Sequence, residues 1–359
     1  MRILLLTLLL LPSFSFSQAL FGYTDFNLYF RSFVNGNYGQ IEHQEVSDVG
    51  MGDEFIVYKN SQKDFKVFNG TSTKIITNQF VTYKHSDHLI AWKLASLLYY
   101  YEDGKPHNLT NWGGEFAVSD SLVVFQDTRF YTLNVVYKGE VIQLMQQTAD
   151  MYMPEIIGEN MVVFRDNGNV YRVFYRGEIY ELGVWNGNQP FQFFAGTDML
   201  AFNDPQSRTF AVFENGEFMD VEDMHARKVK VGRGFMIYED NIGNLKKYSK
   251  GKVETISSYF NEWDAYDDVF VWNESNSLYT MVGNEKTKIA GYEVKEWKLK
   301  NDVIAIRNQM GGVSVFHNNK LTEITNIPDT EFDLNAHAVM VHLMNKSVIC
   351  YYNGRVFRD

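Results

Sequence analysis

The chain has 359 residues, of which 45% are hydrophobic and 16% aromatic, and its formal net charge is −11 at pH 7. The 44 acidic against 33 basic residues argue against nonspecific binding of nucleic acid, because such binding needs a basic face against the phosphates. A single cysteine, Cys350, excludes an intramolecular disulfide, so the core must hold the fold by itself. We expect this thiol to be a small core residue in a strand over 348–352.

The N-terminus has the pattern of a Sec-type export signal. Arg2 precedes an apolar run from Ile3 to Leu11, and small residues follow at Ser15 and Ser17. We therefore expect residues 1–17 to be a signal peptide, cleaved before Gln18. Residues 18–359 contain no linker-like tract and no apolar run of about 18 residues or more, so we expect one domain without a transmembrane segment. The expected location is the periplasm or the outer membrane, or outside the cell.

A two-residue turn recurs along the whole chain at a spacing of roughly 35 residues, which is the signature of a repeat architecture. The ten copies are Asn35-Gly36, Asn69-Gly70, Asp103-Gly104, Lys138-Gly139, Arg176-Gly177, Asn215-Gly216, Lys250-Gly251, Gly283-Asn284, Asn318-Asn319 and Asn353-Gly354. An aromatic-rich strand precedes the turn and a closing strand follows it, as in the segment 171–182.

A short apolar run between successive turns gives each unit a second constant feature. Nine copies are found, at 55–58, 89–92, 122–125, 161–164, 199–202, 235–238, 269–272, 303–306 and 338–341. Runs of four apolar residues, rich in β-branched and aromatic types, predict strands that are buried on both faces. A further short strand and a polar corner, such as Ser119-Asp120 or Gly158-Glu159, come before each run. Each unit is therefore predicted to be a meander of four antiparallel strands.

The predicted fold is an all-β propeller, in which each four-stranded unit is one blade of a ring. In pattern, residues 24–359 resemble propellers of the TolB and WD-repeat kind. The nine apolar runs predict nine blades, and eight blades with an extra hairpin is the alternative. Because the first turn has no complete unit before it and residues 355–359 form only a short last strand, we expect the N- and C-terminal strands to share one sheet and close the ring.

Residues that could carry chemistry are few and do not form a known catalytic pattern. His85 and His88 flank Asp87, but a spacing of three places two side chains on opposite faces of a strand, which favours a polar corner over a metal site. The Asp- and Asn-rich loops at 166–169 and 239–244 lack the full set of calcium ligands and fit hairpin loops better. We therefore predict no catalytic residues, no metal and no cofactor.

One segment combines acidic and aromatic residues unusually densely, at a junction between two units. It contains Glu262, Trp263, Asp264, Tyr266, Asp267 and Asp268. These residues could bind a basic segment of a partner or a sugar stacked on Trp263, and paired carboxylates could serve hydrolysis. The alternative is structural: the aromatic side chains pack between blades and the carboxylates form a solvated rim.

The function predicted from these features is a non-enzymatic, exported scaffold that binds another envelope or secreted protein. In size, export signal and all-β repeat character, the chain is similar to the propeller-like plug on the periplasmic side of the type IX secretion translocon. That resemblance implies a place in a secretion machinery. The alternative function is a propeller that binds or cleaves a glycan at the channel mouth.

Overall fold

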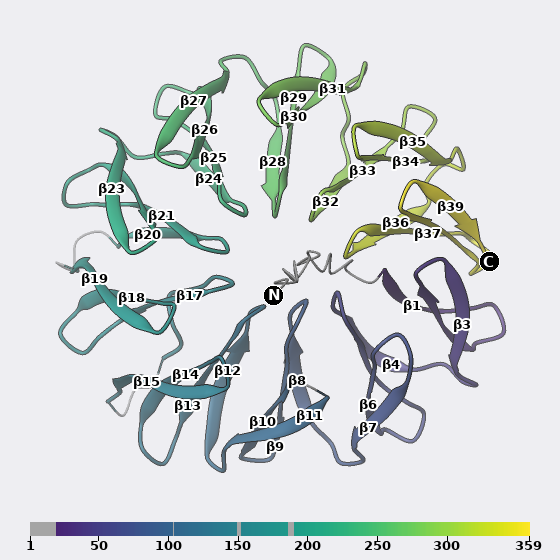
Figure 1. Ribbon diagram of the computed structural model, residues 1–359, viewed down its shortest axis with the longest axis horizontal. Helices are drawn as coiled ribbons and strands as arrows, with labels where there is room; N and C mark the ends of the chain where they lie inside the picture. The colour runs from purple at the N-terminus through teal and green to yellow at the C-terminus, as the bar shows by residue number, and fades with distance from the viewer. Residues whose placement is uncertain (1–18, 103, 149–151, 186–189) are drawn as a thin grey trace, which may run out of the picture.

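The structure is a computed structural model that describes residues 19–102, 104–148, 152–185 and 190–359, so the expected signal peptide lies outside the described residues. The described residues form 39 β-strands in ten sheets, which are arranged radially as the blades of a ring (Figure 1). Blade 1 contains β1–β3, and each of blades 2 to 10 contains the next four strands in chain order. All neighbouring strands of a blade pair antiparallel, which confirms the predicted propeller of meander units.

The first strand of blades 2 to 10 is the one nearest the axis, and the second strand follows it after a polar corner. The first strands are β4 (Ser47–Met51), β8 (Thr82–His85), β12 (Gly113–Val118), β16 (Ile156–Ile157), β20 (Gln192–Ala195), β24 (Lys228–Val231), β28 (Trp263–Tyr266), β32 (Trp297–Lys300) and β36 (Glu331–Asn335). The second strands are β1 (Leu20–Thr24), β5 (Ile56–Lys59), β9 (Ile90–Leu94), β13 (Leu122–Asp127), β17 (Met161–Arg165), β21 (Met199–Asn203), β25 (Met236–Glu239), β29 (Val269–Glu274), β33 (Val303–Arg307) and β37 (Ala338–His342).

The third and fourth strands form the outer hairpin of each blade, and the recurrent turn joins them. The third strands are β2 (Phe30–Val34), β6 (Phe65–Phe68), β10 (Leu97–Glu102), β14 (Thr132–Tyr137), β18 (Val170–Tyr175), β22 (Phe210–Glu214), β26 (Leu245–Ser249), β30 (Ser277–Val282), β34 (Val313–His317) and β38 (Val348–Tyr352). The fourth strands are β3 (Asn37–Glu42), β7 (Thr73–Thr77), β11 (Lys105–Thr110), β15 (Glu140–Gln146), β19 (Glu178–Val184), β23 (Glu217–Glu222), β27 (Lys252–Ser257), β31 (Glu285–Ala290), β35 (Lys320–Thr325) and β39 (Arg355–Arg358).

The second strands are apolar on both faces because each is packed between two neighbouring blades. In β17, Met161 and Val163 face the core shared with blade 6, whereas Val162 and Phe164 face the core shared with blade 4. All four side chains are fully buried. Since successive side chains of a strand point to opposite faces, burial on both faces produces the continuous apolar runs found in the sequence.

The blade count is ten, so the prediction of nine blades is wrong. The missing apolar run is β1, which follows directly after the expected signal peptide and is interrupted by Gly22. A side chain could not be accommodated there: a Cβ atom on Gly22 would lie 2.7 Å from the ring of Phe30. The ten recurrent turns do correspond to the ten blades, with backbone φ angles such as +50° and +93° at Asn35 and Gly36 that favour Asn and Gly.

The prediction that the two termini share one sheet is also wrong. The last blade is completed by its own fourth strand, β39, and β1–β3 form a separate sheet. The ring closes through side chains instead: Phe21 and Phe33 of blade 1 pack with Met340 and Cys350 of blade 10. At the rim, Asp359 accepts hydrogen bonds from the Tyr23 hydroxyl at 2.7 Å and from Arg31 at 2.9 Å.

The ring has two distinct faces because the connections alternate along each antiparallel meander. The turns between first and second strands and between third and fourth strands lie on one face, which we call the corner face. The connections between second and third strands and between successive blades lie on the other, which we call the loop face. The buried thiol of Cys350 lies in the core between the faces, as predicted.

Candidate functional site

The corners between first and second strands converge near the axis of the ring and are joined from blade to blade by backbone hydrogen bonds. Asp53 N donates to Asp87 O at 2.8 Å, Arg233 N donates to Asp267 O at 2.6 Å, and Asn160 N donates to Thr197 O at 3.2 Å. These polar corners therefore form an inner belt on the corner face.

Four glycines make this close approach of neighbouring corners possible. A Cβ atom would lie 2.6 Å from Asp87 O at Gly52, 2.6 Å from Gly196 O at Gly158, and 2.8 Å from Gly232 O at Gly196. At Gly232 it would collide with Asp267 O. Each of these glycines precedes the polar corner residue of its blade, so the Gly-polar pair is a local signal for a corner in contact with the next blade.

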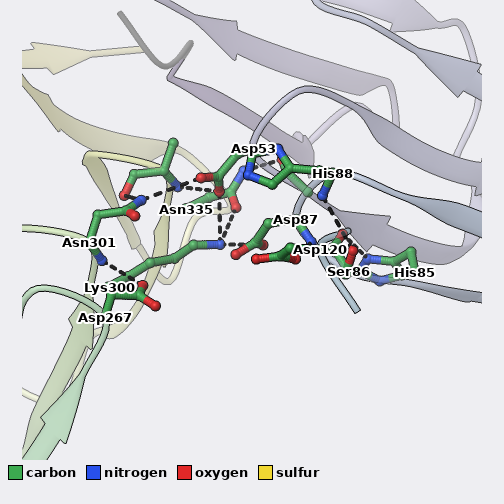
Figure 2. Close-up of polar contacts among 12 residues, drawn as sticks. Asp53, His85, Ser86, Asp87, His88, Asp120, Asp267, Lys300, Asn301 and Asn335 are labelled. Carbon is green, nitrogen blue, oxygen red and sulfur yellow. Dashed lines mark hydrogen bonds and ion pairs between the residues drawn. The ribbon is translucent and has the colours of Figure 1, made fainter. Parts of the chain in front are cut away.

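A buried lysine connects blades that are far apart in the sequence (Figure 2). Lys300, at the end of β32, lies 2.9 Å from Asp53 Oδ1 and 2.6 Å from Asp87 Oδ1, and it donates to Asn335 Oδ1 at 3.0 Å. Burial disfavours the charged amine, but the two carboxylates outweigh burial and raise the pKa of Lys300. We call Lys300, Asp53, Asp87 and Asn335 the lysine bridge; it links blades 9 and 10 to blades 2 and 3.

Beside the lysine bridge, the corners of blades 3 to 8 surround an open cavity of about 390 Å³. Four carboxyl groups line it, those of Asp87, Asp120, Glu159 and Asp267, together with the ring of Tyr266. We call this feature the acidic cavity. Its size is within the range of small-ligand pockets, about 300–1,000 Å³.

Three carboxyl groups of the acidic cavity, those of Glu159, Asp267 and Asp87, are held in conditions that disfavour their charge. Burial raises the pKa of Glu159, and Asp120 adds to this effect. Burial likewise raises the pKa of Asp267 and of Asp87, although Arg233 and Lys300 act against it. Burial and the surrounding carboxylates also raise the pKa of Tyr266, which still has half of its side chain exposed. The cavity therefore concentrates negative charge that its own cations compensate only in part.

The acidic segment singled out in the sequence comprises β28, the innermost strand of blade 8, and the residues next to its ends, and the structure divides it. Tyr266 and Asp267 line the acidic cavity, and Asp268 beside them pairs with Arg233 at 2.7 Å. Trp263 is 3% exposed and packs in the core between blades 7 and 8.

The other two members of the segment lie away from the cavity. Asp264 is 3.4 Å from Lys230 on the neighbouring blade. Glu262 is exposed before β28, where its carbonyl accepts a hydrogen bond from Asn273 N.

The histidines and the Asp-rich loops have local partners. His85 also lines the acidic cavity, whereas His88 is 3.5 Å from Glu54. Asp166 and Asp240 each accept backbone hydrogen bonds within their own loops, at 2.8 Å from Gly168 N and 2.8 Å from Asn244 N. Among the described residues, no group of three or more His, Cys, Asp or Glu side chains has an arrangement that could hold a metal ion.

A second cluster of ionisable groups lies between blades 9 and 10 and was not predicted. Asp302 is 2.5 Å from His337 Nδ1 and 3.0 Å from His317 Nε2, and the other ring nitrogen of His317 is 3.2 Å from the Tyr351 hydroxyl. The hydrogen bond to Asp302 raises the pKa of His337. The residues of this cluster come from blades 9 and 10 and are distant in the sequence, so no short sequence motif indicates it.

Exposed large apolar side chains are distributed unequally between the two faces. Among the described residues, those that lie outside strands are all on the loop face: Phe26, Leu28, Tyr29, Phe80, Trp112, Phe130, Tyr131, Met224, Ile242, Tyr259, Met310, Ile327 and Met344. The turns of the corner face contribute none to this set. The two faces thus differ in chemistry: the corner face has carboxylates around a cavity, and the loop face has apolar tips.

Comparison with known proteins identifies the repeat. The family model described as a 10-bladed beta propeller domain matches residues 14–357. No curated protein matches the sequence. Within the described residues, no helix is long and apolar enough to cross a membrane.

Among solved structures, the chain is similar to the computationally designed Ika8 protein, with 12% identity and a TM-score of 0.39 over 86% of this chain and 96% of that chain. It is also similar to human WBSCR16, with 8% identity and a TM-score of 0.37 over 71% and 83% of the two chains. Prp20p from Saccharomyces cerevisiae is 8% identical, with a TM-score of 0.34 over 67% and 72%. Similarities this low carry no argument about function.

Proposed function

Since this chain belongs to the 10-bladed β-propeller domain family, we propose that it is a non-enzymatic scaffold whose acidic cavity receives a basic segment of another protein. The observation that carries this proposal is the convergence of four carboxyl groups from blades 3, 4, 5 and 8 on one open cavity. Burial, with a smaller contribution from neighbouring carboxylates, raises the pKa values of Glu159 and Asp267, and a lysine or arginine side chain entering the cavity would stabilise their charged forms.

Binding of a short basic peptide tests this proposal directly. The probe is acetyl-Lys-Arg-Lys-amide with a fluorescent label, titrated against the full chain at low and high salt. We expect saturable binding that weakens with salt and falls about fivefold in each of Asp120→Asn and Glu159→Gln, which is ~1 kcal/mol per charge pair. Both substitutions keep the side-chain size, and Asp120 retains an acceptor for the hydrogen bond from Asp87 N.

Asp264→Asn is the matched control, because this carboxylate is on the same strand as Tyr266 but pairs with Lys230 outside the cavity. Equal binding of a Gln-Gln-Gln probe, or unchanged binding in both cavity variants, would contradict the proposed function.

We place this scaffold in the cell envelope, exported by residues 1–17 and bound to another envelope or secreted protein. A component of a secretion machinery similar to the type IX plug is one such setting. The N-terminal signal pattern supports export, and the interlocked inner belt supports a rigid role. Mass spectrometry of the protein from its native envelope tests export: the expected chain begins at Gln18, and an intact N-terminus in the cytoplasmic fraction would contradict it.

A glycan is the second candidate ligand of the acidic cavity. The half-exposed ring of Tyr266 beside Asp267 and Glu159 is the observation in its favour, because sugars stack on aromatic rings while their hydroxyl groups bond to carboxylates. A panel of neutral glycans distinguishes this candidate: binding lost in Tyr266→Ala but insensitive to salt would favour it over the basic segment. Release of reducing ends would further indicate hydrolysis.

A further inference from the structure

Blade 4 has the densest group of exposed aromatic residues on the loop face. Trp112 precedes the first strand of this blade, and Phe130 and Tyr131 lie in the connection between its second and third strands. These three side chains are 45%, 60% and 49% exposed. The guanidinium group of Arg129 lies between two of them, 5.5 Å from the Trp112 ring centre and 5.4 Å from the Phe130 ring centre. We call Trp112, Arg129, Phe130 and Tyr131 the tip patch.

The backbone under the tip patch is held by a network of hydrogen bonds. Asp127 Oδ1 accepts from Arg129 N at 2.9 Å and from Phe130 N at 3.1 Å, and its other oxygen accepts from the Thr110 hydroxyl at 2.5 Å. Thr128 N donates to Trp112 O at 2.8 Å, which fixes the two connections against each other. The aromatic side chains are therefore presented on a preorganised backbone, which itself loses little conformational entropy when a partner binds.

Arg129 is the charged residue of the tip patch. Although the chain has 44 acidic residues, Arg129 has no ion pair among the described residues, and its charge is met only by the faces of aromatic rings. Arginine, tryptophan and tyrosine are the residues most enriched at the energetic centres of protein interfaces. An exposed guanidinium between aromatic rings pairs well with a planar carboxylate, which it can bind through two parallel hydrogen bonds.

From this arrangement we infer that the tip patch is a second docking surface, which binds a protein segment carrying an Asp or Glu side chain between apolar residues. This surface is separate from the acidic cavity and on the opposite face, so the scaffold can hold two partners of opposite charge at once. A short acidic segment needs to contact only the tip patch, whereas an anionic membrane would cover the whole loop face. Exposed carboxylates such as Glu155, Glu262 and Glu293 lie in its other connections and would be repelled by anionic lipid.

The test uses labelled pentapeptides and the full chain. Phe-Asp-Leu-Glu-Phe is the expected ligand, and Phe-Asn-Leu-Gln-Phe has the same shape without the charge. We expect the acidic peptide to bind at least tenfold more tightly than its amide counterpart. This preference should disappear in Arg129→Gln, and binding should fall at least tenfold in Trp112→Ala. Because both residues are exposed, the thermal midpoint of each variant should match that of the unmodified chain.

Met344→Ser and Arg355→Gln are the matched controls, an exposed apolar tip on blade 10 and a charged side chain outside the patch, and neither should change binding. Three results would each overturn the inference: no saturable binding of the acidic peptide up to about 1 mM, equal binding of the two peptides, or unchanged binding in Arg129→Gln. Binding to phosphatidylcholine vesicles that is lost with Trp112→Ala, without a preference for the acidic peptide, would assign the patch to a membrane instead.

Discussion

Removing the amine of the lysine bridge should destabilise the ring far more than removing a neighbouring exposed amine. In Lys300→Met, the apolar part of the side chain remains, but Asp53 and Asp87 lose the cation that lies 2.9 and 2.6 Å from them. The Lys300, Asp53 and Asp87 side chains are only 12%, 7% and 23% exposed, so water cannot replace the amine fully. Breaking a buried ion pair from one side typically costs about 3–5 kcal/mol. At ~2.1 cal/mol/K per residue, that loss lowers the thermal midpoint by about 4–7 °C for a chain of this length.

The control is Lys298→Met, two residues earlier on the same strand. Lys298 pairs with Asp333 at 2.8 Å, but the two side chains are 46% and 48% exposed, and such pairs contribute about 0–1 kcal/mol. Thermal unfolding followed by circular dichroism at neutral pH measures both variants. Equal midpoints for the two variants would refute the conclusion that the Lys300 amine of the lysine bridge stabilises the contact of blades 9 and 10 with blades 2 and 3.

The pH dependence of the Lys300→Met variant follows from the sign of the Asp87 shift. Burial already raises the pKa of Asp87 above its ordinary value with Lys300 present, and without Lys300 it must rise further. A carboxyl group with a raised pKa in the folded state is protonated more readily there than in the unfolded chain, so folding is favoured as the pH falls. The deficit of the variant should therefore be largest at neutral pH and should shrink as the pH falls toward about 5.

Three further predictions concern the inner belt, the cluster at Asp302 and the core. Gly158→Ala places a Cβ atom 2.6 Å from Gly196 O and should cost about 1–3 kcal/mol in denaturant unfolding, whereas Gly291→Ala, with nothing within 4 Å, should be nearly neutral. His337→Gln should lower the free energy of unfolding by about 1 kcal/mol at pH 6 and by little at pH 9. The pKa of His337 is raised in the folded state, so protonation of this histidine stabilises the fold below about pH 6.5, and the stabilisation is lost as the pH rises through the folded-state pKa. Equal losses at the two pH values would contradict this. Burial raises the pKa of Cys350 to about 12, so the native thiol should not react with an aromatic disulfide reagent and should react fully after unfolding.

The blade architecture could be predicted from the sequence because its determinants are local. The recurrent turn requires positive φ angles, and the second strand requires apolar residues on both faces, so both leave a mark in every repeat. The predicted blade count is wrong because the second strand of blade 1 is not a continuous apolar run. Gly22 interrupts it, since the Phe30 ring occupies the space that a side chain at this position would need.

The site could be predicted only in part, because the residues that form it are distant in the sequence and come together only when the ring closes. The polar corners and the segment around Tyr266 are visible in the sequence, but nothing there shows that Asp87 and Lys300, 213 residues apart, touch each other. The recurring pair of a glycine and a polar residue at Gly52-Asp53, Gly158-Glu159 and Gly196-Thr197 is a signal that could have located the inner belt. The tip patch could not have been found from the sequence. Its aromatic residues differ from the many core aromatic residues only in being exposed, and the sequence does not show exposure.

The lysine bridge also takes part in closing the ring, where blade 10 meets blades 1 and 2. Blade 10 contacts both blade 1 and blade 2 here: Asn335 Nδ2 donates to Leu20 O and to Gly52 O at 2.7 Å, and Ala336 N donates to Asp53 Oδ1 at 3.1 Å. Asp53 is 5% exposed, and its carboxylate accepts from blade 10 while it pairs with Lys300 of blade 9. Hydrogen bonds to a charged group are stronger than neutral ones, so this single carboxylate strengthens the contact of blade 2 with blades 9 and 10. The charges on the corner face are thus divided between two tasks. Asp53 is paired with Lys300 within the ring, and the carboxyl groups of Asp120, Glu159 and Asp267 line the acidic cavity.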